Sequence, residues 1–182
     1  MLLQFDDDPA ECVDDGRVTP EGRALSDGYP IAGEAFDLEL FGLLSAFAGS
    51  PELSRLSESY PGVANLRVTF DRSEAARRLL VVGAMVRNAL DTWASRSSRT
   101  TDAVGDLIAD ILRPTERGTL TLREACNKIL HADEIDLDEH SGEAPGALSR
   151  QVRMYGRRGD QAWEAHLDVI AFVESACRLD VS

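Results

Sequence analysis

Residues 120–133, LTLREACNKILHAD, form the most regular stretch of this chain. Thr121 is a good N-cap, and Glu124, three positions on, completes a capping box. The apolar residues that follow recur at helical spacing and fall on one face when the chain turns about 100° per residue. They are Leu122, Ala125, Cys126, Ile129 and Leu130. The stretch therefore predicts an amphipathic helix that begins after Thr121.

Arg123, Asn127 and His131 recur every fourth residue along this predicted helix. This spacing places a guanidinium, an amide and an imidazole in one slanting row beside the apolar face. Histidine is the usual general acid or base near neutral pH, so the row is a candidate catalytic site. The same row equally fits an ordinary polar margin, in which His131 interacts with the carbonyl end of its helix. Both interpretations stay open at this point.

Four further segments follow a helical period in the sequence. The first covers residues 36–47 and is ended by Gly49, Ser50 and Pro51, and the longest runs from 73 to about 95, with Gly83 at a predicted close helix crossing. A helix after Asp102 stops before Pro114, and Asp160 opens the last helix.

Other segments favour strands. Residues 63–70, VANLRVTF, have the β-branched content of a short strand, while residues 135–138 and 149–155 alternate and predict a β-hairpin. The predicted fold class is mainly α, an antiparallel helical bundle with a small β-hairpin before the C-terminal helix. The predicted core consists of Leu79, Leu80, Val86, Leu90, Trp93, Leu107, Ile108, Ile111, Ile129, Leu130, Trp163, Leu167, Ile170 and Val173.

The chain of 182 residues suits one domain with an N-terminal extension. Residues 1–34 are dense in acids and turn formers, which predicts an acidic, mostly irregular arm. Residues 35–182 are then a single helical-bundle domain.

The net charge of −13 is concentrated in two segments. Residues 1–35 hold nine acids against Arg17 and Arg23, and residues 131–146 hold six acids and no Lys or Arg. Non-specific nucleic-acid binding is therefore disfavoured. An RNA substrate reached through a local arginine cluster, or a basic protein partner for the acidic segments, remains compatible with this distribution.

The composition predicts a cytoplasmic protein. No apolar run approaches the roughly 20 residues of a membrane span, and the acidic N-terminus is unlike a secretory leader. Cys126 and Cys177 both fall in apolar helical patterns, which predicts reduced, buried thiols.

Several chemistries lack their sequence motifs. The chain has no phosphate-binding glycine loop, no dinucleotide fingerprint, no zinc-type histidine spacing and no nucleophile elbow. His140 is expected in a solvated loop and His166 at the edge of the core. No cofactor and no metal are predicted.

The helix with Arg123, Asn127 and His131 resembles proteins of the HEPN superfamily, whose signature is an arginine and a histidine on one helix, often with a polar residue such as Asn beside the arginine. Here the Arg-to-His spacing is wider than is usual in that family. The resemblance implies an all-α bundle that dimerises with its motif helices facing each other, and in active members a metal-independent ribonuclease site. It would make His131 the proton shuttle, Arg123 the group that stabilises the phosphate charge, and Asn127 the orienting residue.

Three hypotheses about function follow. The first is a HEPN-like, metal-independent ribonuclease of a defence or toxin–antitoxin system. The second is a non-catalytic HEPN-like dimeric interaction module that binds a basic protein partner. The third is an unrelated helical protein in which the polar row is only a boundary of the core.

Overall fold

The computed structural model describes residues 33–93, 101–111, 117–138 and 146–179. The predicted arm of residues 1–34 lies outside this part, except that Gly33 and Glu34 begin the first helix. In chain order the elements are α1 (Gly33–Ser59), α2 (Pro61–Trp93), β1 (Ala103–Ile108), β2 (Arg117–Thr121), α3 (Leu122–His131), β3 (Glu134–Asp138), β4 (Leu148–Arg158), β5 (Gln161–Asp168) and α4 (Val169–Cys177).

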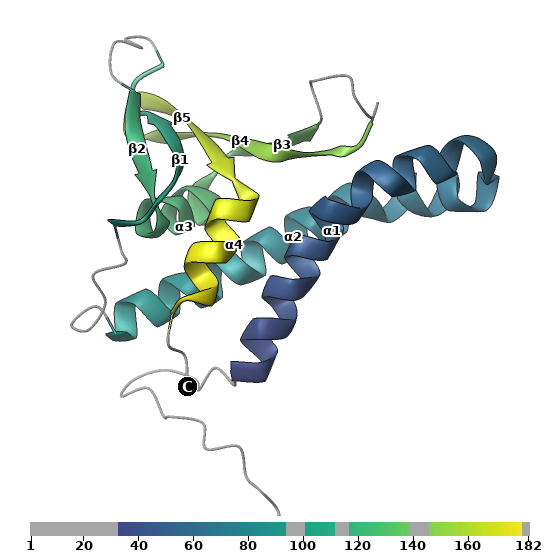
Figure 1. The fold of residues 1–182 in the computed structure, drawn as a ribbon. Coiled ribbons are helices and arrows are strands. Elements are labelled where there is room, and N and C mark those ends of the chain that lie inside the picture. Colours follow the sequence, from purple (N-terminus) through teal and green to yellow (C-terminus); the bar gives the residue numbers. More distant parts are fainter. Residues whose placement is uncertain (1–32, 94–100, 112–116, 139–145, 180–182) are drawn as a thin grey trace, which may run out of the picture.

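The five strands form one antiparallel sheet in the order β2-β1-β5-β4-β3. The four helices lie on one side of this sheet, and α1 and α2 form a long antiparallel pair that extends past the ends of β3 and β4 (Figure 1). Alternate residues of β5 are accordingly buried against the helices: Trp163, Ala165 and Leu167 are at most 3% exposed. The molecule is a helical layer packed on one face of a sheet.

The predicted bundle with a single hairpin is therefore wrong. The hairpin of β3 and β4 is present, but β1, β2 and β5 extend it to a five-stranded sheet. Residues 161–168 form strand β5, where the sequence predicted the start of the last helix, and β1 replaces the helix predicted after Asp102. The error has a simple cause: Trp163 and Leu167 are four residues apart, a spacing that puts two side chains on the same face of either a helix or a strand.

The helical pair contains two further corrections. α1 continues through Pro51 to Ser59 instead of ending at residues 49–51. Residues 63–70, predicted as a strand, belong to α2, where Thr69 Oγ1 donates a hydrogen bond to Asn65 O at 2.8 Å. Intrinsic strand preference is weak and depends on pairing, and among the described strands none pairs with this segment.

The core lies between the sheet and the helices. Leu79, Val86, Leu90, Ile129, Trp163, Leu167 and Val173 are buried, as predicted. Leu80, Ile111, Leu130 and Ile170 are instead 37–41% exposed, Leu107 and Ile108 are partly buried, and the side chain of Trp93 lies outside the described part. The close crossing predicted at Gly83 is confirmed, because a Cβ built there would lie 2.9 Å from Ile129 Cγ2 of α3.

The two cysteines of the described chain differ in their surroundings. Cys126 is buried, and this burial raises the pKa of its thiol to about 12, which leaves the thiol protonated and unreactive at neutral pH. Cys177, predicted to be buried, is exposed at the end of α4.

Candidate functional site

The helix α3 forms as its sequence predicts. Thr121 is the N-cap, and its Oγ1 accepts a hydrogen bond from Glu124 N at 3.3 Å. Leu122, Ala125 and Cys126 are fully buried on the face that packs against the core. The position and phase of the polar row on α3 are therefore those expected from the sequence.

The first two residues of the row contact α2 rather than an open site. Arg123 Nη1 lies 2.6 Å from Asp91 Oδ1, and Arg123 Nη2 donates to Leu90 O at 3.2 Å. Asn127 Oδ1 accepts a hydrogen bond from Arg87, whose Nε also donates to Asp91 Oδ2 at 2.7 Å. Arg87, Asp91, Arg123 and Asn127 together form what we term the α2–α3 clamp.

His131 lies apart from this clamp. It is the last residue of α3 and is exposed, and the structure gives it no hydrogen bond or ion pair with any described residue. It is eight positions on from Arg123, which corresponds to about 12 Å along the helix axis. The structure therefore does not bring His131 into the network of Arg123 and Asn127.

Electrostatics supports a structural role for the clamp. Partial burial by itself would raise the pKa of Asp91, but the hydrogen bonds and charges of Arg87 and Arg123 together outweigh it and lower that pKa. The ionised carboxylate of Asp91 therefore holds both guanidinium groups. The clamp joins α2 to α3 at the edge of the core.

We expect Asp91→Asn to lower the free energy of unfolding at pH 7 by less than about 1 kcal/mol, because the carboxylate is half exposed and solvent screens it. The pKa of Asp91 is lower in the folded than in the unfolded chain, so its contribution is present above the unfolded pKa and is lost as the pH falls through the folded value. Urea unfolding of both proteins at several pH values should show the difference at pH 7 vanish in acid. A difference that persists in acid would contradict an electrostatic clamp.

The structure also contains a groove that lies apart from the polar row on α3. It lies between α2 and the end strand β3 and has a volume of about 380 Å³. We term it the β3 groove, and it is lined by Arg72, Ser73, Ala76, Glu134, Ile135, Asp136 and Leu137. The sequence predicts the alternating acidic strand, but only the tertiary structure places α2 beside it.

A second pocket, of about 200 Å³, shares Arg72 with the β3 groove. Beside it Arg67 connects α2 to both neighbours: its Nη1 donates to Ser57 Oγ at 3.0 Å, its Nη2 donates to Gly146 O, and its Nε lies 3.6 Å from Asp71 Oδ2. Ser50 Oγ donates to the same Asp71 carboxylate at 3.1 Å. This network fixes the helical pair to the chain that enters β4, and so positions one wall of the groove.

The sheet face opposite the helices carries charged residues in cross-strand register. His166 lies between Asp106 of β1 and Arg153 of β4, and its Nε2 lies 2.6 Å from Glu164 Oε1. Tyr155 is the direct neighbour of Glu164 on β4. The sequence predicted His166 at the edge of the core, but it lies partly buried on the outer face of the sheet, where Asp106 and Arg153 on the two neighbouring strands carry opposite charges.

The described residues also bear on two other classes of protein, those that bind a metal ion and those that span a membrane. No group of three or more His, Cys, Asp or Glu residues in the described ranges is arranged to hold a metal ion. Within the same ranges, no helix has both the length and the apolar character needed to span a membrane.

Comparisons with known proteins add no family. No family model matches the chain, and neither a curated protein nor a solved structure is significantly similar to it. The resemblance to HEPN proteins therefore stays a prediction that depends on α3, and the all-α bundle that it implied is not the fold of this chain.

Proposed function

We propose that this protein is a non-catalytic interaction module whose β3 groove binds a basic, extended segment of a protein partner. The observation that supports this most directly is the position of β3. It is an end strand, paired with β4 alone among the described strands, and its other side borders the groove with α2. An end strand of this kind can accept a further strand through its backbone.

The side chains along the groove favour a basic ligand. Glu134 and Asp136 line it together with Arg72, and exposed Asp133 immediately precedes β3, so acidic residues outnumber basic ones around the groove. Residues 131–146 contain no Lys or Arg, so the negative charge of this segment is not balanced from within. Ala76 and Ile135 add apolar surface to the same groove. A strand that alternates basic and apolar residues matches both features, because successive side chains of a strand point to opposite faces.

The polar row on α3 gives less support to catalysis. Arg123 and Asn127 are engaged by α2, and His131 lies about 12 Å farther along the helix. The acids that follow His131 would also repel an RNA backbone. RNA cleavage by Arg123, Asn127 and His131 stays a prediction, and cleavage of RNA by the purified protein that is lost in His131→Ala would favour it over the module.

The groove can be tested with a fluorescent peptide of alternating valine and lysine, whose binding is followed by fluorescence anisotropy. We expect Glu134→Gln combined with Asp136→Asn to weaken binding about tenfold, because two charge pairs of up to about 1 kcal/mol each are lost. Added salt should reduce the difference.

The matched control combines Asp160→Asn with Glu174→Gln, which removes the same charge from exposed positions on the β4–β5 turn and on α4. This control should bind as the wild type does, and a valine–glutamate peptide should bind far more weakly. Equal losses in both double variants would show a non-specific response to net charge and would contradict a site at β3.

A further inference from the structure

The outward surface of α2 carries a partly apolar stripe at the spacing of a coiled-coil seam, whose members are exposed in the described part of the chain. Successive positions are separated by four, three, four, three and four residues, which keeps all of them on one side of the helix. We term this the α2 outer stripe, and its members are Leu66, Phe70, Ser73, Arg77, Leu80 and Ala84. Leu66, Phe70 and Leu80 are 63%, 58% and 41% exposed, a large apolar area to leave in water.

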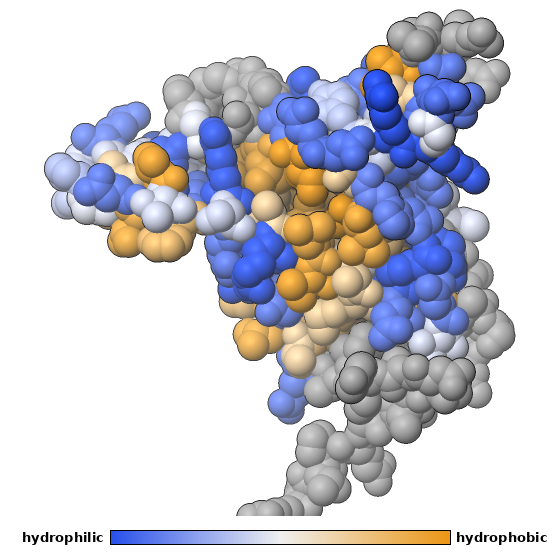
Figure 2. All heavy atoms as spheres, turned by 180° about the vertical axis from the view of Figure 1, so that it is seen from behind, coloured by the Kyte–Doolittle hydropathy of each residue, from blue (hydrophilic) through white to orange (hydrophobic). Residues whose placement is uncertain are grey.

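The stripe lies on an accessible side of the molecule. α2 lies behind α1 in Figure 1, and Figure 2 shows the molecule from that side, with apolar side chains exposed among charged ones. The opposite side of α2 packs on the core through Leu79, Val82 and Val86, which are fully buried. α2 thus has apolar side chains on two faces, and within the described part of the chain only one of these faces is buried.

We propose that a second copy of this chain covers the α2 outer stripe, with the two α2 helices antiparallel about a two-fold axis near Ala75. The positions of the stripe are arranged symmetrically about that residue. Leu66 and Ala84 are equally distant from it, as are Phe70 and Leu80, and Ser73 and Arg77. In an antiparallel pair, each residue therefore meets its counterpart on the other copy.

This register pairs side chains of complementary size. Leu66 lies against the partner's Ala84, and Phe70 lies against the partner's Leu80. Ser73 leaves room for the long side chain of the partner's Arg77. A symmetric interface requires such self-complementarity, since the same surface serves both subunits.

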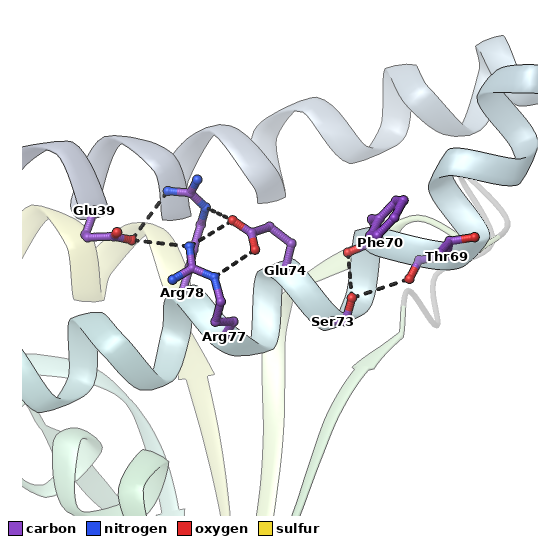
Figure 3. A network of polar contacts seen from close by, with 7 residues as sticks. All are labelled: Glu39, Thr69, Phe70, Ser73, Glu74, Arg77 and Arg78. Carbon is purple, nitrogen blue, oxygen red and sulfur yellow. Dashed lines mark hydrogen bonds and ion pairs between the residues drawn. The ribbon is translucent and has the colours of Figure 1, made fainter.

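The charges beside the axis are also self-complementary. Arg77 Nε lies 2.8 Å from Glu74 Oε2 within one chain, and Arg78 Nε donates to Glu74 Oε1 at 2.8 Å (Figure 3). Glu39 of α1 lies on the other side of the two arginines (Figure 3). Because Glu74 and Arg77 are on opposite sides of Ala75, antiparallel packing brings each Arg77 near Glu74 of the partner subunit. The interface then contains opposite charges at its centre rather than like ones.

The mass in solution tests this proposal. Light scattering with size-exclusion chromatography, from micromolar to about 100 µM protein, should give a mass that rises toward twice the 19.9 kDa of one chain. Phe70→Ser combined with Leu80→Ser should raise the dissociation constant of the dimer about 100-fold or more, since it removes the large apolar Phe70–Leu80 pair on each side of the two-fold axis.

Two control variants separate this stripe from general surface apolarity. Val68→Ser changes a residue of α2 that is 88% exposed but lies on another side of the helix, and Phe41→Ser changes one on α1 that is 68% exposed. Both should dimerise as the wild type does. Circular dichroism of each variant checks that it is folded.

A charge exchange tests the register itself. Glu74→Arg or Arg77→Glu alone places like charges near the axis and should weaken the dimer, while the two together should restore it. A wild type that stays monomeric at about 100 µM would overturn the proposal. So would a Phe70→Ser/Leu80→Ser protein that dimerises normally. Ser73 belongs to both the stripe and the β3 groove, so peptide binding is measured with the protein dilute enough to be monomeric, and either proposal can then fail alone.

Discussion

Replacing Phe47 by alanine is expected to lower the free energy of unfolding by about 3–5 kcal/mol. Phe47 is fully buried in α1, on the face that packs toward the sheet. Its loss removes the transfer free energy of an aromatic side chain and leaves a cavity that the surrounding helices and strands fill only in part. Urea unfolding followed by circular dichroism measures the change.

The same helix supplies a control of identical chemistry. Phe41 is 68% exposed, and Phe41→Ala should change the free energy of unfolding by no more than about 0.5 kcal/mol. The two substitutions lie six positions apart on α1, so their difference reports burial rather than helix propensity. Equal losses of unfolding free energy in Phe47→Ala and Phe41→Ala would contradict the burial of Phe47.

Gly105→Ala is expected to destabilise the protein by about 3 kcal/mol or more. A Cβ at this position would lie 1.9 Å from the carbonyl oxygen of His166 and 3.2 Å from Leu167 Cα. Both atoms belong to the backbone of β5, which cannot move aside as a flexible side chain can. Gly105 also lies where the register between β1 and β2 shifts, so the close approach belongs to an irregularity in the middle of the sheet.

Gly118→Ala in the adjacent strand β2 is the matched control. A Cβ there would meet only Leu107 O, at 3.7 Å, which is ordinary van der Waals contact. This substitution should be neutral or slightly stabilising, since alanine loses less conformational freedom than glycine on folding. Thermal unfolding of the two variants should therefore show a large decrease in melting temperature for Gly105→Ala alone. Similar behaviour of both would contradict the approach of β1 to β5.

The sequence correctly predicted those elements that are determined by residues close together in the chain. The N-cap at Thr121, the buried face of α3 and the hairpin of β3 and β4 are all present, because capping and strict alternation act within a few residues. The prediction of a helix for residues 161–168 was wrong for the opposite reason. Their inward side chains fit a helical spacing as well as a strand spacing, and the pairing with β4 and β1 that decides between them is not local.

The candidate site, too, was predictable only where it depends on neighbouring residues. The sequence placed Arg123 and Asn127 on one side of α3, but it did not reveal that Asp91 and Arg87, more than 30 residues earlier, would engage them. It also predicted an acidic strand in a hairpin at residues 135–138, while the α2 wall of the β3 groove could not be predicted from any single segment.

What the sequence alone determined is therefore the local geometry: the start and phase of α3, the acidic hairpin, the uneven charge and the close crossing at Gly83. Only the tertiary structure decided that five strands form one sheet, that the α3 row is joined to α2, and that Leu66, Phe70 and Leu80 of α2 are exposed. The physical reason is that hydrogen bonding between strands and contacts between distant helices depend on residues far apart in the chain, whereas capping and amphipathicity depend on neighbours.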